Sequence, residues 1–137
     1  MTLVVDASVA VEFVLGSSTG RQARDILTEQ DGDLHAPELL IAESLSALRR
    51  LERHGELTGD RAHEAVRDLL DLPIRRYPTV VLAPRIWGLR GRFTVYDAHY
   101  LALAETLDAT LFTGDQRFAG RARDLVRVIV PRRQPEA

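Results

Sequence analysis

Short apolar runs alternate along the chain with segments whose apolar residues recur at helical spacing. β-Branched and apolar runs predict strands at 2–5, 34–36, 74–77, 110–113 and 126–130. Amphipathic spacing, with capping residues and glycine stops, predicts helices at 6–15, 19–29, 37–54, 58–72, 79–89 and 94–107. Because short buried strands alternate with helices, we expect an α/β layered fold with a mainly parallel sheet.

The length of 137 residues fits one domain, which we place at residues 1–131 with a short tail at 132–137. Two acids, Asp6 and Glu12, interrupt the first apolar stretch, and no basic segment precedes it, so a signal peptide is not expected. No apolar run reaches the roughly 18 residues that a membrane span needs. We therefore expect a cytoplasmic protein without a membrane partner.

Cysteine and lysine are both absent from the chain, and each of these absences excludes a class of chemistry. Without cysteine the chain has no disulfide, no thiolate nucleophile and no cysteine zinc site. Without lysine it has no P-loop lysine and no Schiff-base lysine, because all 18 basic residues are arginine. The net charge of −2 does not by itself indicate a nucleic-acid binder.

Four acids follow or interrupt apolar runs, where a folded chain rarely places a carboxylate without a partner or a cation. They are Asp6, Glu43, Asp97 and Asp115. Parallel sheets bind ligands beyond the carboxyl ends of their strands, and Asp6 and Asp115 both stand just past predicted strands. Glu43 is the only charge between Leu39 and Leu48. We therefore expect these side chains to meet in one site.

Each acid also has a structural explanation. Asp6 and Asp115 suit helix capping or a turn, and Asp97 stands three residues after Thr94 in a capping-box arrangement. Glu43 could instead pair with Arg50. Together, however, two ionised carboxylates about 4 Å apart repel by about 4 kcal/mol at an effective dielectric near 20. Four such groups need a counter-ion, and Mg²⁺ or Mn²⁺ prefers oxygen ligands.

The same residues, in this order, resemble the PIN domain family, and within it the VapC toxins of bacterial type II toxin–antitoxin systems. The resemblance spans nearly the whole chain. It rests on Val4–Val9, on the segment 37–50 with Glu43, on Thr94–Ala98 followed by Tyr100–Glu105, and on Leu111–Asp115.

This resemblance implies a PIN-like three-layer sandwich with a central sheet of four to five strands. It implies an endoribonuclease dependent on Mg²⁺ or Mn²⁺, neutralised by a cognate VapB-like antitoxin and forming a homodimer. The family's metal-binding and catalytic acids carry over onto Asp6, Glu43, Asp97 and Asp115, and its supporting hydroxyls onto Ser8 and Thr113. Two positions depart from the pattern: Ser46 replaces a frequent asparagine, and Arg117 replaces an acid present in some members.

Other residues have a structural and a functional interpretation. One group of arginines could form a phosphate-binding rim or serve as a solvated surface: Arg49, Arg50, Arg53, Arg75, Arg76, Arg90 and Arg92. A large apolar group could belong to the core or to a dimer surface: Trp87, Leu89, Phe93 and Tyr96. The histidines show no paired ligand spacing, and we interpret them as non-catalytic: His35, His54, His63 and His99.

Three rival functions are compatible with parts of this pattern. A phosphotransfer protein of the receiver or haloacid-phosphatase type also has an aspartate after its first strand, but it depends on a lysine, and a phosphatase needs a second acid where Ser8 stands. A non-catalytic PIN-like module would bind RNA or protein without cleaving it. A third rival is a PIN nuclease outside toxin–antitoxin systems.

Overall fold

A five-stranded, fully parallel sheet forms the centre of the protein in the part of the chain that its structure, a computed structural model, describes: residues 1–29 and 31–132. The strand order is β3-β2-β1-β4-β5. The strands are β1 (Thr2–Val5), β2 (Asp33–Pro37), β3 (Ile74–Tyr77), β4 (Thr110–Phe112) and β5 (Val128–Ile129). The predicted α/β class and the parallel sheet are confirmed.

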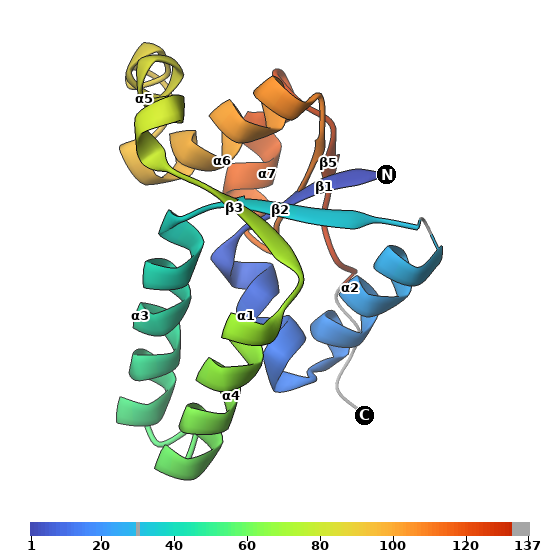
Figure 1. Cartoon of the computed structure of the whole chain (residues 1–137), viewed down its shortest axis with the longest axis vertical. Helices are drawn as coiled ribbons and strands as arrows, with labels where there is room; N and C mark the ends of the chain where they lie inside the picture. The colour runs from blue at the N-terminus through green and yellow to red at the C-terminus, as the bar shows by residue number, and fades with distance from the viewer. Residues whose placement is uncertain (30, 133–137) are drawn as a thin grey trace.

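Helices cover both faces of this sheet and complete a three-layer sandwich. In Figure 1 the sheet crosses the middle of the molecule, with α5 and α6 above it and α1 to α4 below it. The helices are α1 (Ala7–Leu15), α2 (Ser18–Glu29), α3 (Leu39–Arg53), α4 (Gly59–Asp71), α5 (Thr79–Gly88), α6 (Val95–Leu107) and α7 (Gln116–Ala122). In the described residues, no helix is both long and apolar enough to cross a bilayer.

The middle strand β1 is the point where the strand order reverses. The chain first adds β2 and β3 on one side of β1, then crosses over to place β4 and β5 on the other. Val4 is paired with His35 of β2 and with Leu111 of β4. At such a reversal the connections after neighbouring strands leave in opposite directions, which opens a crevice at the carboxyl edge of the sheet.

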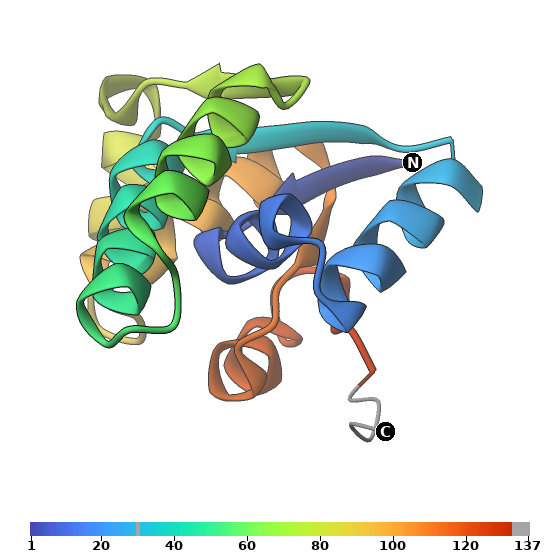
Figure 2. The same ribbon diagram turned by 90° about the horizontal axis from the view of Figure 1, so that it is seen from below.

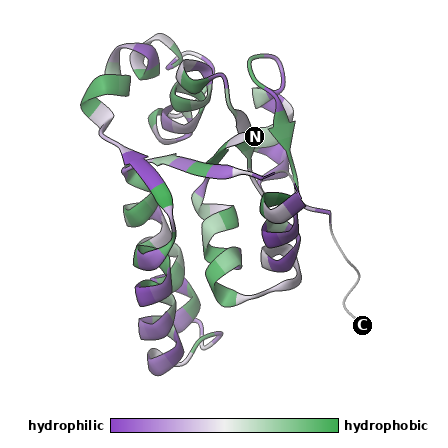
Figure 3. Cartoon of the chain, turned by 45° about the vertical axis from the view of Figure 1, so that its right-hand side comes forward, coloured by the Kyte–Doolittle hydropathy of each residue, from purple (hydrophilic) through white to green (hydrophobic). Residues whose placement is uncertain are grey.

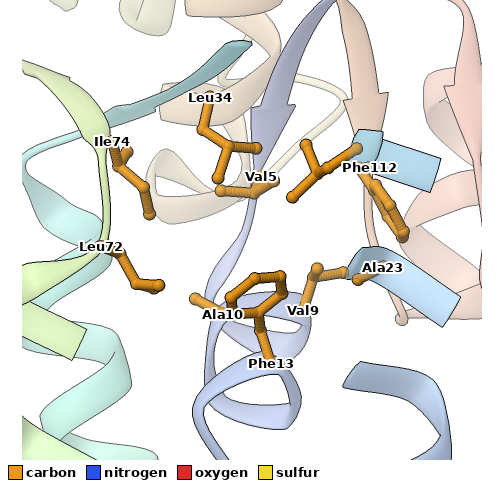
Figure 4. Close-up of a pocket in the computed structure, with 10 residues that line it drawn as sticks. Val5, Val9, Ala10, Phe13, Ala23, Leu34, Leu72, Ile74 and Phe112 are labelled. Atoms are coloured by element: carbon orange, nitrogen blue, oxygen red, sulfur yellow. The ribbon is translucent and has the colours of Figure 1, made fainter. Parts of the chain in front are cut away.

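Apolar side chains fill the space between the sheet and the helices. Figure 3 shows the hydrophobic colour concentrated on α1 and the central strands, and the hydrophilic colour on the outer α3–α4 hairpin. Figure 4 shows side chains of β1, β2, β3 and β4 pointing toward Val9, Ala10 and Phe13 of α1. They leave a cavity of only about 10 Å³ with an entirely apolar lining. A space so small and apolar does not hold a water molecule.

Residues with special backbone roles fix several helix ends as predicted. Gly16 ends α1 and Gly55 follows α3, and both adopt left-handed backbone angles, with φ of 67° and 76°. The side-chain hydroxyls of Thr58 and Thr94 each accept a hydrogen bond from the backbone N–H three residues later, at 3.1 Å. Local chemistry therefore sets these boundaries.

One expectation about the elements was wrong, and one helix was not predicted. Pro37 does not open a helix: it is the last residue of β2, and α3 starts at Leu39. Proline lacks an N–H, so it is tolerated at the end of this ladder as well as in a first helical turn. Helix α7 was not predicted. Of the expected tail 132–137, only Arg132 is described, and its backbone exchanges two hydrogen bonds with the side chain of Gln22.

Helices α1 and α2 are neighbours (Figure 2). At Gly20 they approach each other so closely that only glycine fits at the crossing. A Cβ atom on Gly20 would lie 2.1 Å from the carbonyl oxygen of Glu12 and 3.0 Å from the Cα of Phe13. Both are backbone atoms, so the helices would have to separate. At Gly120 of α7, in contrast, a Cβ atom would have no neighbour within 4 Å.

Replacing Gly20 with alanine is therefore expected to lower the free energy of unfolding by about 1 to 3 kcal/mol, the usual cost of overpacking. Gly120→Ala is the matched control, and it should raise the same free energy by about 0.5 to 1 kcal/mol, because glycine is a poor helix former. Urea unfolding followed by circular dichroism measures both. Equal stability of the Gly20→Ala variant and the parent would contradict the crossing geometry.

Candidate active site

A cleft of about 610 Å³ lies at the carboxyl edge of the sheet, where the strand order reverses. All four predicted acids line it, and each comes from a different element. Asp6 follows β1, Glu43 lies in α3, Asp97 lies in the first turn of α6, and Asp115 caps α7 after β4. The expectation that these distant positions meet in one cleft is confirmed.

Asp6 is the most buried of the four, with 7% of its surface exposed. One carboxylate oxygen, Oδ1, accepts hydrogen bonds from the backbone N–H of Val9 at 3.2 Å and from the hydroxyl of Ser8 at 2.5 Å. The other oxygen, Oδ2, accepts a hydrogen bond from the hydroxyl of Thr113. The side chain thus caps α1 and faces the cleft at the same time.

Ser8 and Thr113 connect Asp6 to the loop after β4. The Ser8 hydroxyl accepts a hydrogen bond from the backbone N–H of Gly114 at 2.8 Å. The Thr113 hydroxyl accepts one from the backbone N–H of Asp115 at 3.0 Å. Both hydroxyls therefore donate to Asp6 and accept from the loop that carries Asp115. They fix the position of the two acids relative to each other.

The electrostatics of the cleft resist ionisation of two of its acids, Asp6 and Asp97. Burial raises the pKa of the Asp6 carboxyl to about 6, although the hydrogen bonds from Ser8, Thr113 and Val9 act in the opposite direction. Burial also raises the pKa of Asp97, with further contributions from the negative charges of Asp115 and Glu43. In the described residues, no ion pair with an arginine compensates any of the four carboxylates.

Glu43 has a partner that the sequence pattern did not predict. Its Oε1 atom accepts a hydrogen bond of 2.5 Å from the hydroxyl of Tyr100 in α6. The alternative pairing with Arg50 is not formed in the described residues. Burial, followed by the bond to Glu43, raises the pKa of the Tyr100 hydroxyl far above its usual range, so it stays a donor. The sequence contained one indication of this role for Tyr100. It stands three residues after Asp97, which places both side chains on one face of α6.

The structural explanations of the acids coexist with the functional one. Asp115 Oδ1 accepts hydrogen bonds from the backbone N–H groups of Arg117 and Phe118, both at 3.0 Å, and so caps α7. Asp97 belongs to a turn capped by Thr94. At Asp115 both capping bonds go to Oδ1, so the cap does not occupy its other oxygen. Capping therefore orients these acids and does not exclude a role in chemistry.

The other candidates are divided between the cleft and the surface. Of the predicted arginine rim only Arg50 lines the cleft, and of the histidines only His54 does. The predicted apolar group is divided between the core and the surface. Leu89 and Phe93 are each only 4% exposed, whereas Trp87 is 63% and Tyr96 is 62% exposed. The two departures from the family pattern, Ser46 and Arg117, are both exposed.

The oxygen ligands in the cleft are of the type that binds a hard divalent cation. Their positions, however, do not form a complete metal site. The cleft offers carboxylate oxygens that form no arginine ion pair within the described residues, and Mg²⁺ and Mn²⁺ prefer oxygen ligands of this kind. Among the residues that the structure describes, however, no three of the histidines, aspartates and glutamates come close enough to form a ready metal-binding group. Glu43 and Asp97 are only partly buried and Asp115 is exposed, so these side chains have room to rotate inward.

Comparison with known proteins gives a match over almost the whole chain. Residues 3–124 match the family model described as PIN domain. Ribonuclease VapC9 from Mycobacterium tuberculosis is 39% identical over 132 residues, which cover 95% of this chain and 99% of the relative.

Solved structures agree with this match at the level of the fold. PAE2754 from Pyrobaculum aerophilum superimposes with a TM-score of 0.70 at 20% identity, covering 93% of this chain and 83% of that one. VapBC2 from Rickettsia felis, bound to a DNA fragment from its promoter, gives a TM-score of 0.64 at 10% identity, covering 96% and 100%. With the sheet order, the acid-lined cleft and the match of residues 3–124, the chain belongs to the PIN domain family.

Proposed function

We propose that this protein is a divalent-metal-dependent endoribonuclease of the VapC type, the toxin of a toxin–antitoxin pair. The observation that carries the proposal is the convergence of four acids on one cleft, with no compensating arginine ion pair in the described part of the chain: Asp6, Glu43, Asp97 and Asp115. The 39% identity to a ribonuclease along nearly the whole chain supports RNA as the substrate.

In this proposal Asp6 and Asp97 hold the Mg²⁺ or Mn²⁺ ion, and Asp115 and Glu43 hold its water ligands or a second ion. Their oxygens fit such an ion by charge and hardness, provided that the exposed and partly buried side chains rotate toward each other. When bound, the cation supplies neutralisation of the carboxylates, polarisation of a phosphoryl oxygen and a more acidic attacking water.

The protein's own contribution is orientation. Ser8 and Thr113 hold both oxygens of Asp6 in fixed positions between β1 and the loop after β4. Tyr100 holds Glu43 by a hydrogen bond that spans from α6 to α3. A carboxylate that is already held in place, as Asp6 is, needs little rearrangement as charge develops on the phosphate, and this lowers the barrier for in-line attack on the RNA backbone.

The rivals differ in what they need from this cleft. A receiver or haloacid-type phosphotransfer protein needs a lysine that the chain lacks. A non-catalytic PIN-like module does not need oriented acids. A PIN nuclease outside toxin–antitoxin systems would have the same cleft without an antitoxin.

Two protein partners belong to the proposal. The first is a VapB-like antitoxin, supported by the VapC relative and by the likeness in fold to a VapBC complex. The second is another copy of this chain. Exposed apolar side chains on α5 and at the start of α6 support a homodimer surface there: Val80, Val81, Trp87, Val95 and Tyr96.

Substitution of Asp97 by asparagine is expected to reduce Mn²⁺-dependent RNA cleavage by about 100-fold or more, because the variant loses a charged oxygen ligand. Single-turnover cleavage of a labelled RNA measures the loss, with and without a chelator.

Asp68→Asn is the matched control, since Asp68 is an exposed acid of α4 that does not line the cleft. Tyr100→Phe removes only the hydroxyl that holds Glu43, so its rate should lie between those of the parent and Asp97→Asn. A folded Asp97→Asn variant that cleaves RNA at the parental rate would exclude this mechanism.

The pKa of Asp6 predicts how the stability of metal-free protein depends on pH. Its folded-state pKa of about 6 exceeds the ordinary value of 3.8, so between these pH values the folded state binds more protons than the unfolded state. The free energy of unfolding should therefore fall as pH rises from about 4 to above 6, by at most about 3 kcal/mol.

Urea titrations in the presence of a chelator test this, with Asp6→Asn as the comparison. The fall should be smaller in the variant, and Mn²⁺ should restore stability at neutral pH in the parent more than in Asp6→Asn. An equal fall in both proteins would show that Asp6 is not its source.

The two proposed partners can be tested by light scattering after size-exclusion chromatography, which measures the molecular mass of the chain alone and of its complex with an antitoxin. The chain alone should have the mass of a dimer, and Trp87→Glu should convert it to a monomer because a charge replaces an apolar contact. Coexpression with a cognate VapB-like antitoxin should give a larger complex that does not cleave RNA. A parental monomer, or a complex that retains full cleavage, would contradict the corresponding partner.

A further inference from the structure

The cleft has a charge imbalance that an RNA substrate must overcome. Six acids line it, and only two basic residues do. The acids are Asp6, Glu12, Glu43, Glu56, Asp97 and Asp115, and the basic residues are Arg50 and His54. A bound cation neutralises part of this charge, but the phosphates on either side of the scissile bond still approach a negative surface. Positive groups at the cleft border would therefore determine how RNA is held.

Arg121 is positioned at this border, although the pattern of the sequence did not single it out. It lies in the last turn of α7 and is exposed. Its guanidinium carbon is 5.0 Å from the centre of the Phe93 ring. Its positive charge lowers the pKa of Asp97, against the larger effects of burial, Asp115 and Glu43. In the described part of the chain it forms no ion pair.

The ring beneath Arg121 is fixed by the segments that carry two of the acids. Phe93 is 4% exposed and packs edge-to-face against Phe118, with ring centres 6.3 Å apart. The backbone N–H of Phe118 donates to Asp115, so the α7 segment is tied to that acid. Phe93 directly precedes Thr94, which caps the turn of Asp97. The position of Arg121 is therefore coupled to the positions of Asp97 and Asp115.

A second arginine, Arg92, also lies over the Phe93 ring, but unlike Arg121 it has an acidic partner. The guanidinium carbon of Arg92 is 5.6 Å from the Phe93 ring centre, but this side chain also donates to Asp124 at 3.3 Å. Its charge is already partnered. A guanidinium that lies over an aromatic ring keeps the N–H groups along its edge free for an acceptor, and the contact limits its rotamers.

We propose that Arg121 binds a backbone phosphate of single-stranded RNA on the α7 side of the cleft, with Phe93 as the platform that holds its guanidinium group. The assignment rests on the ribonuclease function proposed above. The phosphate it contacts is adjacent to the scissile one, because Arg121 is near enough to Asp97 to lower its pKa but does not itself line the cleft. Arg121 therefore binds and positions the substrate and does not take part in the chemical step.

The test is RNA binding as a function of salt. Arg121→Gln is compared with Arg123→Gln, a matched control that removes an exposed arginine of the same helix end that neither lies over Phe93 nor lines the cleft. Both changes are made in the Asp97→Asn background, and fluorescence anisotropy of a labelled single-stranded oligoribonucleotide reports the affinity. Steady-state cleavage is measured for both changes in the otherwise unchanged protein.

Arg121→Gln is expected to weaken binding by about three- to tenfold and to make the slope of log affinity against log salt about 0.7 shallower, the value for one phosphate contact on a single strand. KM should rise with little change in kcat. Arg121→Lys keeps the charge, so it should retain the slope, and it serves as the readout if the glutamine variant is unstable.

Three results would overturn the proposal: an unchanged affinity and slope in Arg121→Gln, an equal loss in Arg123→Gln, or a fall in kcat at constant KM. If the parent and Arg123→Gln cleave RNA while Arg121→Gln binds it normally, only the role of Arg121 is lost. If the parent neither binds nor cleaves RNA, the ribonuclease function fails, and the role of Arg121 fails with it.

Discussion

The buried carboxylate of Asp6 is the constraint on which the site depends. It stands at the end of the central strand, caps the following helix, and receives hydroxyl hydrogen bonds from both sides of the strand reversal. Its neighbours Ser8 and Thr113 also bind the backbone that leads to Asp115. A single side chain thus joins β1, α1 and the loop after β4. The energetic conflict is also concentrated here, since burial disfavours the charge that the proposed chemistry requires.

The other three acids are likewise positioned by elements of the fold. Asp97 and Asp115 are placed by helix starts, and Glu43 is placed by a tyrosine from the opposite layer. None of them relies on an arginine partner in the described residues, in contrast to most partly buried carboxylates. The result is a cleft whose acids are oriented but mutually repulsive, which is a suitable condition for a site that gains stability when a cation enters.

The sequence predicted the fold and the identities of the four acids because both depend on local signals. Alternating runs marked the strands and helices, and charges at strand ends or inside apolar faces marked the site. The contact between Tyr100 and Glu43 was not predictable in this way, because 57 residues separate the partners. Helix α7 was missed because it is only seven residues long. Spacing also did not reveal that Phe93 is buried whereas Trp87 is exposed, since that depends on which faces other elements cover.

The parallel pairing of β1 with β4 affects how the protein folds during its synthesis on the ribosome. Val4 is paired in register with Leu111, and Asp6 requires Thr113 to complete its hydrogen bonds. At a synthesis rate of about 5 to 20 residues per second, the second half of the cleft emerges about 5 to 20 seconds after the first. A nascent or truncated chain therefore lacks the assembled acids. Unfinished molecules would not yet have the site of the proposed chemistry.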